Sequence, residues 1–297
     1  MLLINSPTSH FQLNQRTIYV KRDDLLDASF SGNKARKLAY FLANPNPKIN
    51  TLISYGGNQS NLMYSLSCLA KLNNWQFIYY TRQISDQAKF NSNGNLAASL
   101  ANGMQIISVN RSLDQLSMQL TANLSENQLL IHQGGAQNEA EFGINQLANE
   151  IRTWARQQKL PALAIFLPSG TGTSALYLQK CLPEFKVYTT NCVGTPEYLM
   201  EQFKNLDQNS TIYPTILPNL NYRFADPKLE LFNLHQQIEQ ISKIEFDLIY
   251  DPVGWKILLQ YIEEIKSPLL YIHCGGLIGN PSMLKRYQYN FPKAFST

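Results

Sequence analysis

The sequence has few of the residues that build metal centres and disulfide frameworks. Its 297 residues include 4 cysteines and 4 histidines. No two cysteines form a CxxC pair, and no cysteine–histidine cluster has the spacing of a zinc site, so the sequence predicts no metal site and no disulfide framework. Isolated cysteines of this kind are typical of a protein from a reducing compartment.

Long apolar runs and concentrated charge are also lacking. No segment has the apolar length of a membrane-spanning helix, and residues 1–10 lack the basic start and the long apolar run of a secretory signal. Charged residues make up 15% of the chain, and the formal net charge is +4 with the basic residues scattered. We therefore expect a cytoplasmic protein that binds neither membranes nor nucleic acids but tolerates a small anionic ligand.

Short apolar runs alternate with helical patterns along the chain, which is typical of parallel sheets covered by helices. The predicted strands are 17–21, 51–54, 76–80, 105–109, 129–132, 163–167, 186–190 and 269–273. The predicted helices include 33–42, 61–72, 143–158 and 174–181. Polar stretches at 44–50 and 157–161 predict two crossings between lobes. We therefore expect a large domain of residues 1–43 and 160–297 and a smaller inserted domain of residues 44–159.

Several predicted strands end directly in glycine-rich turns, at Gly56, Gly134, Gly170 and Gly275. Ligands of open α/β sheets bind at the carboxyl ends of the strands. These turns therefore predict where a ligand site lies.

The segment Gly32-Asn-Lys-Ala-Arg-Lys-Leu38 places lysines in the first turns of a predicted helix. Lys34 and Lys37 are three residues apart and share a helix face, where one amine can bond an aldehyde while the other binds an anion. Partial desolvation and a neighbouring cation lower the pKa of a lysine and provide the neutral amine that such a bond needs. On these residues alone, a solvated basic face that includes Arg36 is the commoner explanation.

A second segment, Ser54-Tyr-Gly-Gly-Asn-Gln-Ser-Asn61, joins a predicted strand to a predicted helix. Its glycines let the backbone approach a ligand closely. Gln59, Ser60 and Asn61 begin the helix with hydrogen-bonding side chains, beside N–H groups that can bind a carboxylate. An ordinary turn with a serine or asparagine cap is the alternative.

A third segment, Ser169-Gly-Thr-Gly-Thr-Ser-Ala175, also lies between a predicted strand and a predicted helix. Its backbone N–H groups and hydroxyls can bind a phosphate at the positive end of the helix. It lacks the ending of a Walker A loop. It does match the dinucleotide-binding fingerprint, but Asn191 ends the next strand, where that fingerprint has a ribose-binding acid. A flexible connecting loop is the structural alternative.

Together these segments resemble the fold type II (tryptophan synthase β-like) pyridoxal phosphate enzymes, most closely the group with 1-aminocyclopropane-1-carboxylate deaminase and D-cysteine desulfhydrase. The resemblance covers most of the chain, and its best-matched parts are 21–24, 32–38, 54–61, 133–136, 169–175 and 273–276. It implies an α/β, two-domain, three-layer αβα fold with pyridoxal 5'-phosphate as the cofactor. It also implies a small amino acid as the substrate and a homodimer.

The resemblance assigns the cofactor-binding residues. It implies that Lys34 binds the cofactor covalently and then moves protons, that Lys37 holds the phosphate and that Asn61 hydrogen-bonds the phenolic oxygen. The phosphate loop is implied to consist of Gly170, Thr171, Gly172 and Thr173.

The substrate is implied to lie against residues of two loops. Ser60 would contact the substrate carboxylate, with Gln59 and Asn61 beside it, or act at the reacting carbon. Tyr222 lies about where the family has another active-site tyrosine, and a packed loop aromatic is the alternative for it.

Two departures from the family pattern bear on the reaction. At Asp251-Pro-Val-Gly-Trp-Lys256 the deaminase pattern is Asp-Pro-Val-Tyr-Glu-Gly-Lys, with a catalytic tyrosine and a glutamate that faces the pyridine nitrogen. Cys274 replaces a threonine that bonds this nitrogen in the desulfhydrase pattern, and a thiol is a weaker partner. Without the glutamate carboxylate beside the pyridine nitrogen, the cofactor withdraws electrons less strongly. This favours β-elimination, which starts from an α-proton, over opening of a cyclopropane that has none.

The sequence therefore predicts a D-cysteine desulfhydrase-like lyase that forms a keto acid, ammonia and sulfide. The alternative is 1-aminocyclopropane-1-carboxylate deaminase, a hydrolase. The alternative from another class is a non-catalytic cofactor-binding or regulatory protein. We expect His273 to be a core histidine and Trp255 to be a core or lobe-interface residue that could reshape the pocket.

Overall fold

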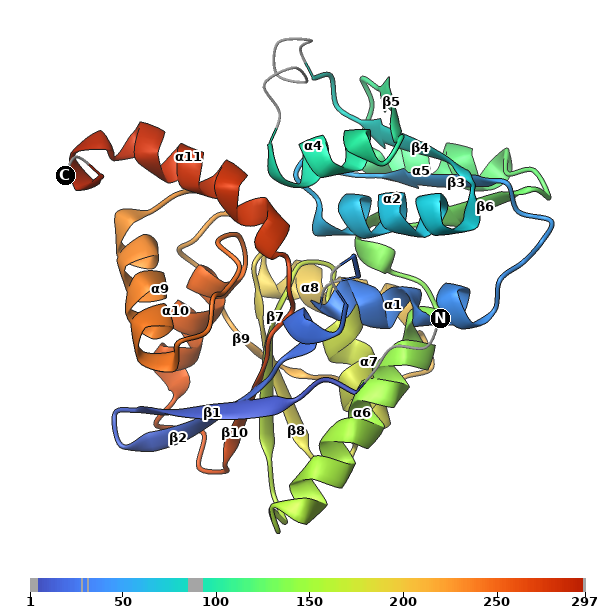
Figure 1. Cartoon of the computed structure of the whole chain (residues 1–297). Coiled ribbons are helices and arrows are strands. Elements are labelled where there is room, and N and C mark those ends of the chain that lie inside the picture. Colours follow the sequence, from blue (N-terminus) through green and yellow to red (C-terminus); the bar gives the residue numbers. More distant parts are fainter. Residues whose placement is uncertain (1–4, 28, 31, 85–92, 296–297) are drawn as a thin grey trace.

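The computed structural model describes residues 5–27, 29–30, 32–84 and 93–295. This part of the chain has a six-stranded sheet in the order β1-β2-β10-β7-β8-β9 and a four-stranded sheet in the order β5-β4-β3-β6 (Figure 1). The strands of the first sheet are β1 (Thr8–Leu13), β2 (Arg16–Lys21), β7 (Ala164–Ser169), β8 (Lys186–Asn191), β9 (Thr215–Leu217) and β10 (Leu269–Ile272). Those of the second are β3 (Thr51–Tyr55), β4 (Gln76–Thr81), β5 (Gln105–Ser108) and β6 (Gln128–Ile131).

Helices cover both sheets. The α-helices are α1 (Gly32–Ala43), α2 (Asn61–Asn73), α4 (Gly94–Ala101), α5 (Leu113–Ala122), α6 (Ala140–Gln157), α7 (Thr173–Cys181), α8 (Pro196–Leu206), α9 (Leu229–Ser242), α10 (Asp251–Tyr261) and α11 (Asn280–Asn290). The 3-10 helices are η1 (Asp23–Leu25), η2 (Gln133–Gly135), η3 (Leu277–Gly279) and η4 (Pro292–Ala294). In the described ranges, no helix combines the length and apolarity needed to cross a bilayer.

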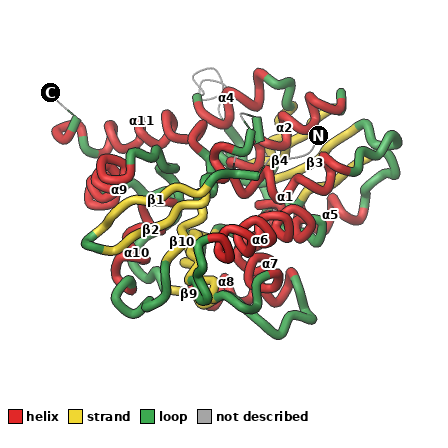
Figure 2. Tube along the Cα trace, turned by 60° about the horizontal axis from the view of Figure 1, so that its bottom comes forward, coloured by secondary structure: helices red, strands yellow, loops and turns green. Residues whose placement is uncertain are grey.

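Alternate residues of the central strands face opposite layers of helices. Ala164, Phe166 and Tyr271 belong to the core with α9 and α10, whereas Ile165 and Leu270 belong to the core with α6, α7 and α8. Successive side chains of a strand point to opposite faces, so a strand buried on both faces is apolar at nearly every position. The six-stranded sheet is therefore the middle of three layers (Figure 2).

The four-stranded sheet repeats this arrangement on a smaller scale. Leu52 and Phe77 belong to the core with α2 and α4, whereas Ile53 and Leu130 pack with Leu116 of α5 on the other face. All three strand pairs of this sheet are parallel. We call the six-stranded sheet with α6 to α10 the large lobe, and the four-stranded sheet with α2, α4 and α5 the small lobe.

Each of the eight predicted strands coincides with an observed strand. The prediction missed β1, which pairs antiparallel with β2, and the short strand β9. It also placed α6 in the smaller domain of residues 44–159, but α6 packs into the core of the large lobe against α7. We therefore move the second boundary toward the start of α6, whereas the boundary after residue 43 stays a prediction.

Candidate active site

The first turn of α1 lies against the end of β10. Gly32 has a φ of +59°, and a Cβ there would lie 1.8 Å from the carbonyl oxygen of Cys274, so only glycine fits. The backbone N–H of Asn33 donates to the same carbonyl over 3.2 Å. The predicted residues Lys34 and Lys37 are thereby held at the carboxyl end of the large sheet.

Both lysine amines have carbonyl-type acceptors rather than carboxylate partners. Lys34 Nζ donates to Asn33 Oδ1 over 2.6 Å, and Lys37 Nζ donates to the carbonyl oxygen of Gly134 over 2.7 Å. Burial lowers the pKa of Lys34, opposed by the charges of Cys274 and Asp247. Burial and the neighbouring Lys34 lower the pKa of Lys37 well below its ordinary value. The site therefore raises the neutral fraction of both amines.

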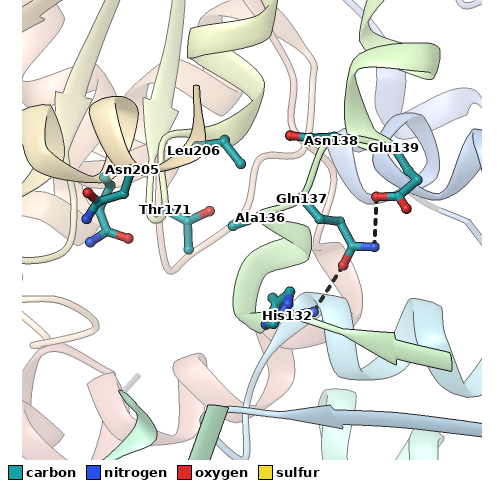
Figure 3. A pocket seen from close by; sticks show the side chains of 9 residues that line it. His132, Ala136, Gln137, Asn138, Glu139, Thr171, Asn205 and Leu206 are labelled. Atoms are coloured by element: carbon teal, nitrogen blue, oxygen red, sulfur yellow. Dashed lines mark hydrogen bonds between the residues drawn. The ribbon is translucent and has the colours of Figure 1, made fainter. Parts of the chain in front are cut away.

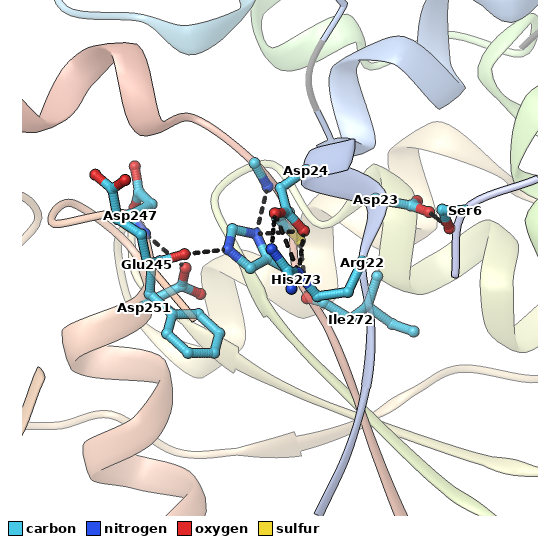
Figure 4. Close-up of polar contacts among 12 residues, drawn as sticks. Ser6, Arg22, Asp23, Asp24, Glu245, Asp247, Asp251, Ile272 and His273 are labelled. Carbon is cyan, nitrogen blue, oxygen red and sulfur yellow. Dashed lines mark hydrogen bonds and ion pairs between the residues drawn. The ribbon is translucent and has the colours of Figure 1, made fainter. Parts of the chain in front are cut away.

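The third basic residue of α1 belongs to a buried ion-pair network. The Arg36 guanidinium is fully buried and donates to Asp23 over 2.8 Å and to Glu150 of α6 over 2.7 Å. Lys21 also pairs with Glu150 over 2.7 Å, and Ser6 Oγ donates to Asp23 over 2.6 Å (Figure 4). The alternative of a solvated basic face is therefore wrong, because Arg36 and Lys37 are buried and the network fixes α1 on the large lobe.

The predicted phosphate loop joins β7 to α7. Gly172 has a φ of +74°, and the hydroxyls of Thr171 and Thr173 are 3.0 Å apart. A Cβ on Gly134 would lie 2.4 Å from Thr171 Cγ2, so this loop touches η2 directly. Because Lys37 is bonded to Gly134, the structure brings the second lysine and the phosphate loop together.

A cavity of about 480 Å³ opens beside this contact (Figure 3). Thr171, Asn205 and Leu206 lie on one side of it, and the segment from Ala136 to Glu139 lies on the other. Gln137 is fixed there, because its Oε1 accepts from the backbone N–H of His132 over 3.1 Å. The cavity is lined mostly by polar residues and includes Thr171 of the predicted phosphate loop.

The predicted substrate-binding residues open α2, as expected. Ser60 is the N-cap, and its Oγ accepts from the N–H of Met63 over 3.4 Å. Gln59 has a buried Oε1 with no partner among the described residues. The Tyr79 hydroxyl donates to the carbonyl oxygen of Gly57 over 3.1 Å and so supports this loop from β4.

Asn61 connects this loop with two residues that the sequence prediction missed. Its Oδ1 accepts from Asn95 over 2.7 Å, and its Nδ2 donates to Asp247 Oδ2 over 3.5 Å. Burial raises the pKa of Asp247 to about 6. Asn95 and Asp247 follow no motif or periodic pattern in the sequence, so no local signal could have found them.

Tyr250 is a further residue of the site that the sequence prediction missed. Its ring lies 3.3 Å from the position that a Cβ on Gly170 would occupy, and it packs against Phe224 with ring centroids 5.3 Å apart. Burial, followed by the nearby charge of Asp247, raises the pKa of Tyr250. Its phenol therefore stays protonated at neutral pH and can donate a hydrogen bond.

Tyr222 lies beside a different cavity from the one at the predicted phosphate loop. It borders a second cavity, of about 510 Å³, with residues such as Cys192 and Phe224. Its hydroxyl donates to Glu230 over 3.0 Å at an exposed position. A role of Tyr222 in the reaction stays a prediction. The contact of its hydroxyl with Glu230 does not support that role.

The departures from the family pattern have a structural explanation. A Cβ on Gly254 would lie 3.0 Å from the hydroxyl of Tyr271, which donates to Asp251 over 2.6 Å. Trp255 is fully buried and stacks on Tyr271 with ring centroids 4.1 Å apart. Trp255 is therefore a core residue, and Tyr271 limits the space beside Gly254.

His273 and Cys274 follow β10 and differ in environment. His273 is fully buried, with Nε2 bonded to the carbonyl of Glu245 over 2.7 Å and Nδ1 accepting from the N–H of Gly275 over 3.0 Å (Figure 4). Both ring nitrogens are satisfied in the neutral form, as expected for a core histidine. Burial, followed by the charge of Asp251, raises the pKa of Cys274, so this residue is a neutral thiol close to Lys34.

Comparison with known proteins gives relatives of one kind. No protein-family model matches the chain. A Thermotoga maritima protein assigned as a 1-aminocyclopropane-1-carboxylate deaminase is 24% identical over 283 residues, which cover 88% of this chain and 89% of that protein. D-cysteine desulfhydrase from Serratia proteamaculans is 25% identical over 292 residues, which cover 88% and 87%.

The solved structures agree with the sequence comparison. A crystal structure described as an ACC deaminase homologue has a TM-score of 0.78 at 19% identity, covering 95% of this chain and 94% of that one. The predicted α/β fold with helix-covered, mainly parallel sheets is therefore confirmed. Over most of its length the chain is therefore similar to proteins named as 1-aminocyclopropane-1-carboxylate deaminase and D-cysteine desulfhydrase, and it shares the fold of the ACC deaminase homologue.

Proposed function

We propose that this chain is a pyridoxal phosphate-dependent lyase that acts on a small amino acid, in the manner of D-cysteine desulfhydrase. The observation that carries the proposal is the pair Lys34 and Lys37 beside a phosphate-type loop, the first partly buried and the second buried, both without carboxylate partners. Two amines withdrawn from water in such a place are costly to the fold unless they serve a ligand. Pyridoxal 5'-phosphate carries both an aldehyde, which one amine can bond, and a phosphate, which the other amine can bind.

The residues present fit pyridoxal 5'-phosphate. Lys34 would hold its aldehyde, and Lys37 would hold its phosphate with the loop from Gly170 to Thr173. Ser174, in the first turn of α7, has a buried Oγ with no partner in the described ranges, which suits a phosphate oxygen. Cys274 is a neutral thiol there and can bond a pyridine nitrogen only weakly.

The chain's own groups account for proton transfer in a β-elimination. Bound in this site, the cofactor supplies an electron sink for the charge left by removal of the α-proton. Once the substrate amine has replaced it at the aldehyde carbon, the freed amine of Lys34, with its lowered pKa, would accept that proton. The β-substituent leaves with its bonding electrons as a thiolate, and water then releases ammonia to leave a keto acid.

The start of α2 suits the substrate carboxylate. The N-terminal N–H groups of a helix attract anions. Ser60 begins this helix, and Gln59 precedes it with a buried, unpartnered amide oxygen. We propose that these two residues and Asn61 orient the amino acid by its carboxylate.

The deaminase reaction on 1-aminocyclopropane-1-carboxylate is the second candidate, and Tyr250 is the observation that favours it. Its phenol lies beside the phosphate loop, although the tyrosine of the deaminase pattern is missing at Gly254. The raised pKa of Tyr250 makes its phenol a donor and a poor base. We therefore rank ring opening, which needs a base or nucleophile at the ring carbons, below β-elimination.

A competition assay separates the two reactions. The purified protein, loaded with cofactor, is given D-cysteine, L-cysteine and 1-aminocyclopropane-1-carboxylate, and sulfide, pyruvate and 2-oxobutanoate are measured. We expect sulfide and pyruvate from D-cysteine. Formation of 2-oxobutanoate alone would establish the deaminase. Cofactor absorbance without product from any amino acid would instead indicate a non-catalytic binding protein.

We propose further that the enzyme is a homodimer in a reducing, cytoplasmic compartment. The relatives and the resemblance support a family of small-molecule enzymes, and all four cysteines are free. Size-exclusion chromatography with light scattering tests the dimer, which should elute at about twice the 33.8 kDa of one chain. The reducing compartment is tested by the redox state of the cysteines in cells.

A further inference from the structure

Asn61, Asn95 and Asp247 form a hydrogen-bonded chain between the lobes. Asn61 begins α2 and Asn95 lies in α4, both in the small lobe, whereas Asp247 lies before α10 in the large lobe. Asn95 Nδ2 donates to Asn61 Oδ1 over 2.7 Å, and Asn61 Nδ2 faces Asp247 Oδ2 over 3.5 Å. Asn95 and Asp247 are each 1% exposed, and Asn61 between them is partly exposed.

The backbone sets the direction of this chain. An asparagine carboxamide can turn by 180° with little change of shape, so its partners decide which end is which. Asn95 Nδ2 also contacts the carbonyl oxygen of Gln59 over 3.1 Å, and a carbonyl can only accept. The donor end of Asn95 is therefore fixed, and it must meet the acceptor end of Asn61. The donor end of Asn61 then points away from Asn95, toward Asp247.

Asp247 is itself held in one orientation. Its Oδ1 accepts from the backbone N–H of Ile249 over 2.9 Å and from that of Tyr250. This leaves Oδ2 for Asn61. With a pKa raised to about 6, the carboxylate is ionised at neutral pH and accepts only. Both ends of the chain therefore favour the same orientation of the Asn61 amide.

Two glycines beside η3 make room for the chain. A Cβ on Gly276 would lie 2.3 Å from Asn61 Nδ2 and 2.9 Å from Asp247 Oδ2. A Cβ on Gly279 would lie 3.1 Å from Asn95 Nδ2 and 3.4 Å from Asn61 Oδ1. The backbone thus confines the amide of Asn61 on the side opposite to α2.

We propose that Asn95 and Asp247 are positioning residues that keep the carboxamide of Asn61 in one orientation, with its Nδ2 end available to the cofactor. This inference rests on the proposed function, in which Asn61 donates to the phenolic oxygen. Nδ2 has two hydrogens, and Asp247 uses one of them. A turned amide would present an oxygen to the phenolic oxygen, and repulsion would replace a hydrogen bond. Because the hydrogen bonds from Asn95 through Asn61 to Asp247 cross from one lobe to the other, the carboxamide of Asn61 is fixed only when the lobes are in contact.

The test measures equilibrium binding of pyridoxal 5'-phosphate to cofactor-free protein by absorbance titration. Asp247→Asn keeps the shape but can donate to Asn61, and Asn95→Asp replaces the donor with an acceptor. Each change should raise the dissociation constant about tenfold, the effect of one hydrogen bond to a charged or polar group. Asp226→Asn is the matched control, because within the described residues the Asp226 carboxylate pairs only with exposed Lys228, and the change should leave binding unchanged.

A double-mutant cycle distinguishes positioning from general damage. If Asp247 acts through Asn61, Asp247→Asn should have almost no further effect on binding in an Asn61→Ala background. Additive effects, or wild-type binding by either folded single variant, would overturn the inference while leaving the proposed function intact. Wild-type protein that binds no cofactor would overturn both. Circular dichroism identifies the folded variants, and either Asp247→Asn or Asn95→Asp suffices for the comparison.

Discussion

At the scale of single residues, the site is defined by charged groups held out of water. Lys34 and Lys37 have no carboxylate acceptor within the described chain, and their pKa values are lowered chiefly by burial. An uncompensated buried cation destabilises the folded state. In the proposed function, a ligand with an aldehyde and a phosphate compensates both amines and so offsets this cost.

Replacement of Lys37 by methionine tests whether this amine lowers the stability of the fold and strengthens cofactor binding. Lys37→Met should raise the free energy of unfolding of the cofactor-free protein by about 1 kcal/mol, because an apolar side chain of similar length replaces a buried amine. It should weaken cofactor binding at least about tenfold through loss of a charged phosphate contact. Urea unfolding and absorbance titration measure the two effects. A destabilised Lys37→Met protein would show that the amine is structural.

Asp247 gives the protein a specific pH dependence. Its folded pKa of about 6 lies above the ordinary 3.8, so between these values the folded state binds more protons than the unfolded state. The contribution of Asp247 to stability is therefore full below pH 4 and is lost as the pH rises through about 6. Urea unfolding of wild type and Asp247→Asn at pH 4, 5, 6 and 7 measures it. The stability difference, wild type minus variant, should fall along this series, and a constant difference would contradict the assigned pKa.

At the scale of elements, the site depends on loops at the carboxyl ends of strands that touch one another. The phosphate loop after β7 meets η2 after β6 through Thr171 and Gly134, and η2 meets α1 through Lys37. The end of β10 meets the first turn of α1 at Gly32. Glycine is required at these contacts because a Cβ would overlap the neighbouring loop.

Gly134→Ala should therefore separate the phosphate loop from α1. Its φ of +71° strains an alanine, and the added Cβ would lie 2.4 Å from Thr171. Gly103→Ala is the matched control, because Gly103 has a φ of +91° but no atom within 4 Å of an added Cβ. Both variants should lose about 1 kcal/mol of stability from backbone strain. Only Gly134→Ala should weaken cofactor binding, by about tenfold or more, and equal binding by the two variants would contradict this role.

At the scale of the whole molecule, a buried ion-pair network joins segments that are distant in the sequence. Arg36 of α1 connects Asp23 after β2 with Glu150 of α6. These contacts fix the helix that carries Lys34 and Lys37 on the large sheet. The network thus couples the stability of the fold to the geometry of the site.

Arg36→Met should destabilise the protein by about 3–5 kcal/mol, because it leaves the carboxylate of Asp23 buried without its partner. Arg152→Met is the control, since Arg152 pairs with Glu184 at a partly exposed surface and should cost about 1 kcal/mol or less. Urea unfolding of both variants gives the comparison. A similar, small loss for the two would show that the network contributes little.

Local patterns in the sequence predicted the strands and the lysine-bearing helix, because apolar runs and glycine turns are properties of neighbouring residues. Lys34, Lys37 and the loop after β7 were found in this way and lie near one another. Asp247 and Tyr250 could not be found, because their contacts with Asn61 and Gly170 join residues far apart in the chain.

The most direct test of the central claim is to map the lysine that binds the cofactor. The protein is mixed with pyridoxal 5'-phosphate, reduced with borohydride and digested, and the peptides are analysed by mass spectrometry. We predict one modified site, Lys34, which is lost in Lys34→Ala while the buried Lys37 stays unmodified in wild type. Modification confined to other lysines, or no stable modification at all, would contradict the account.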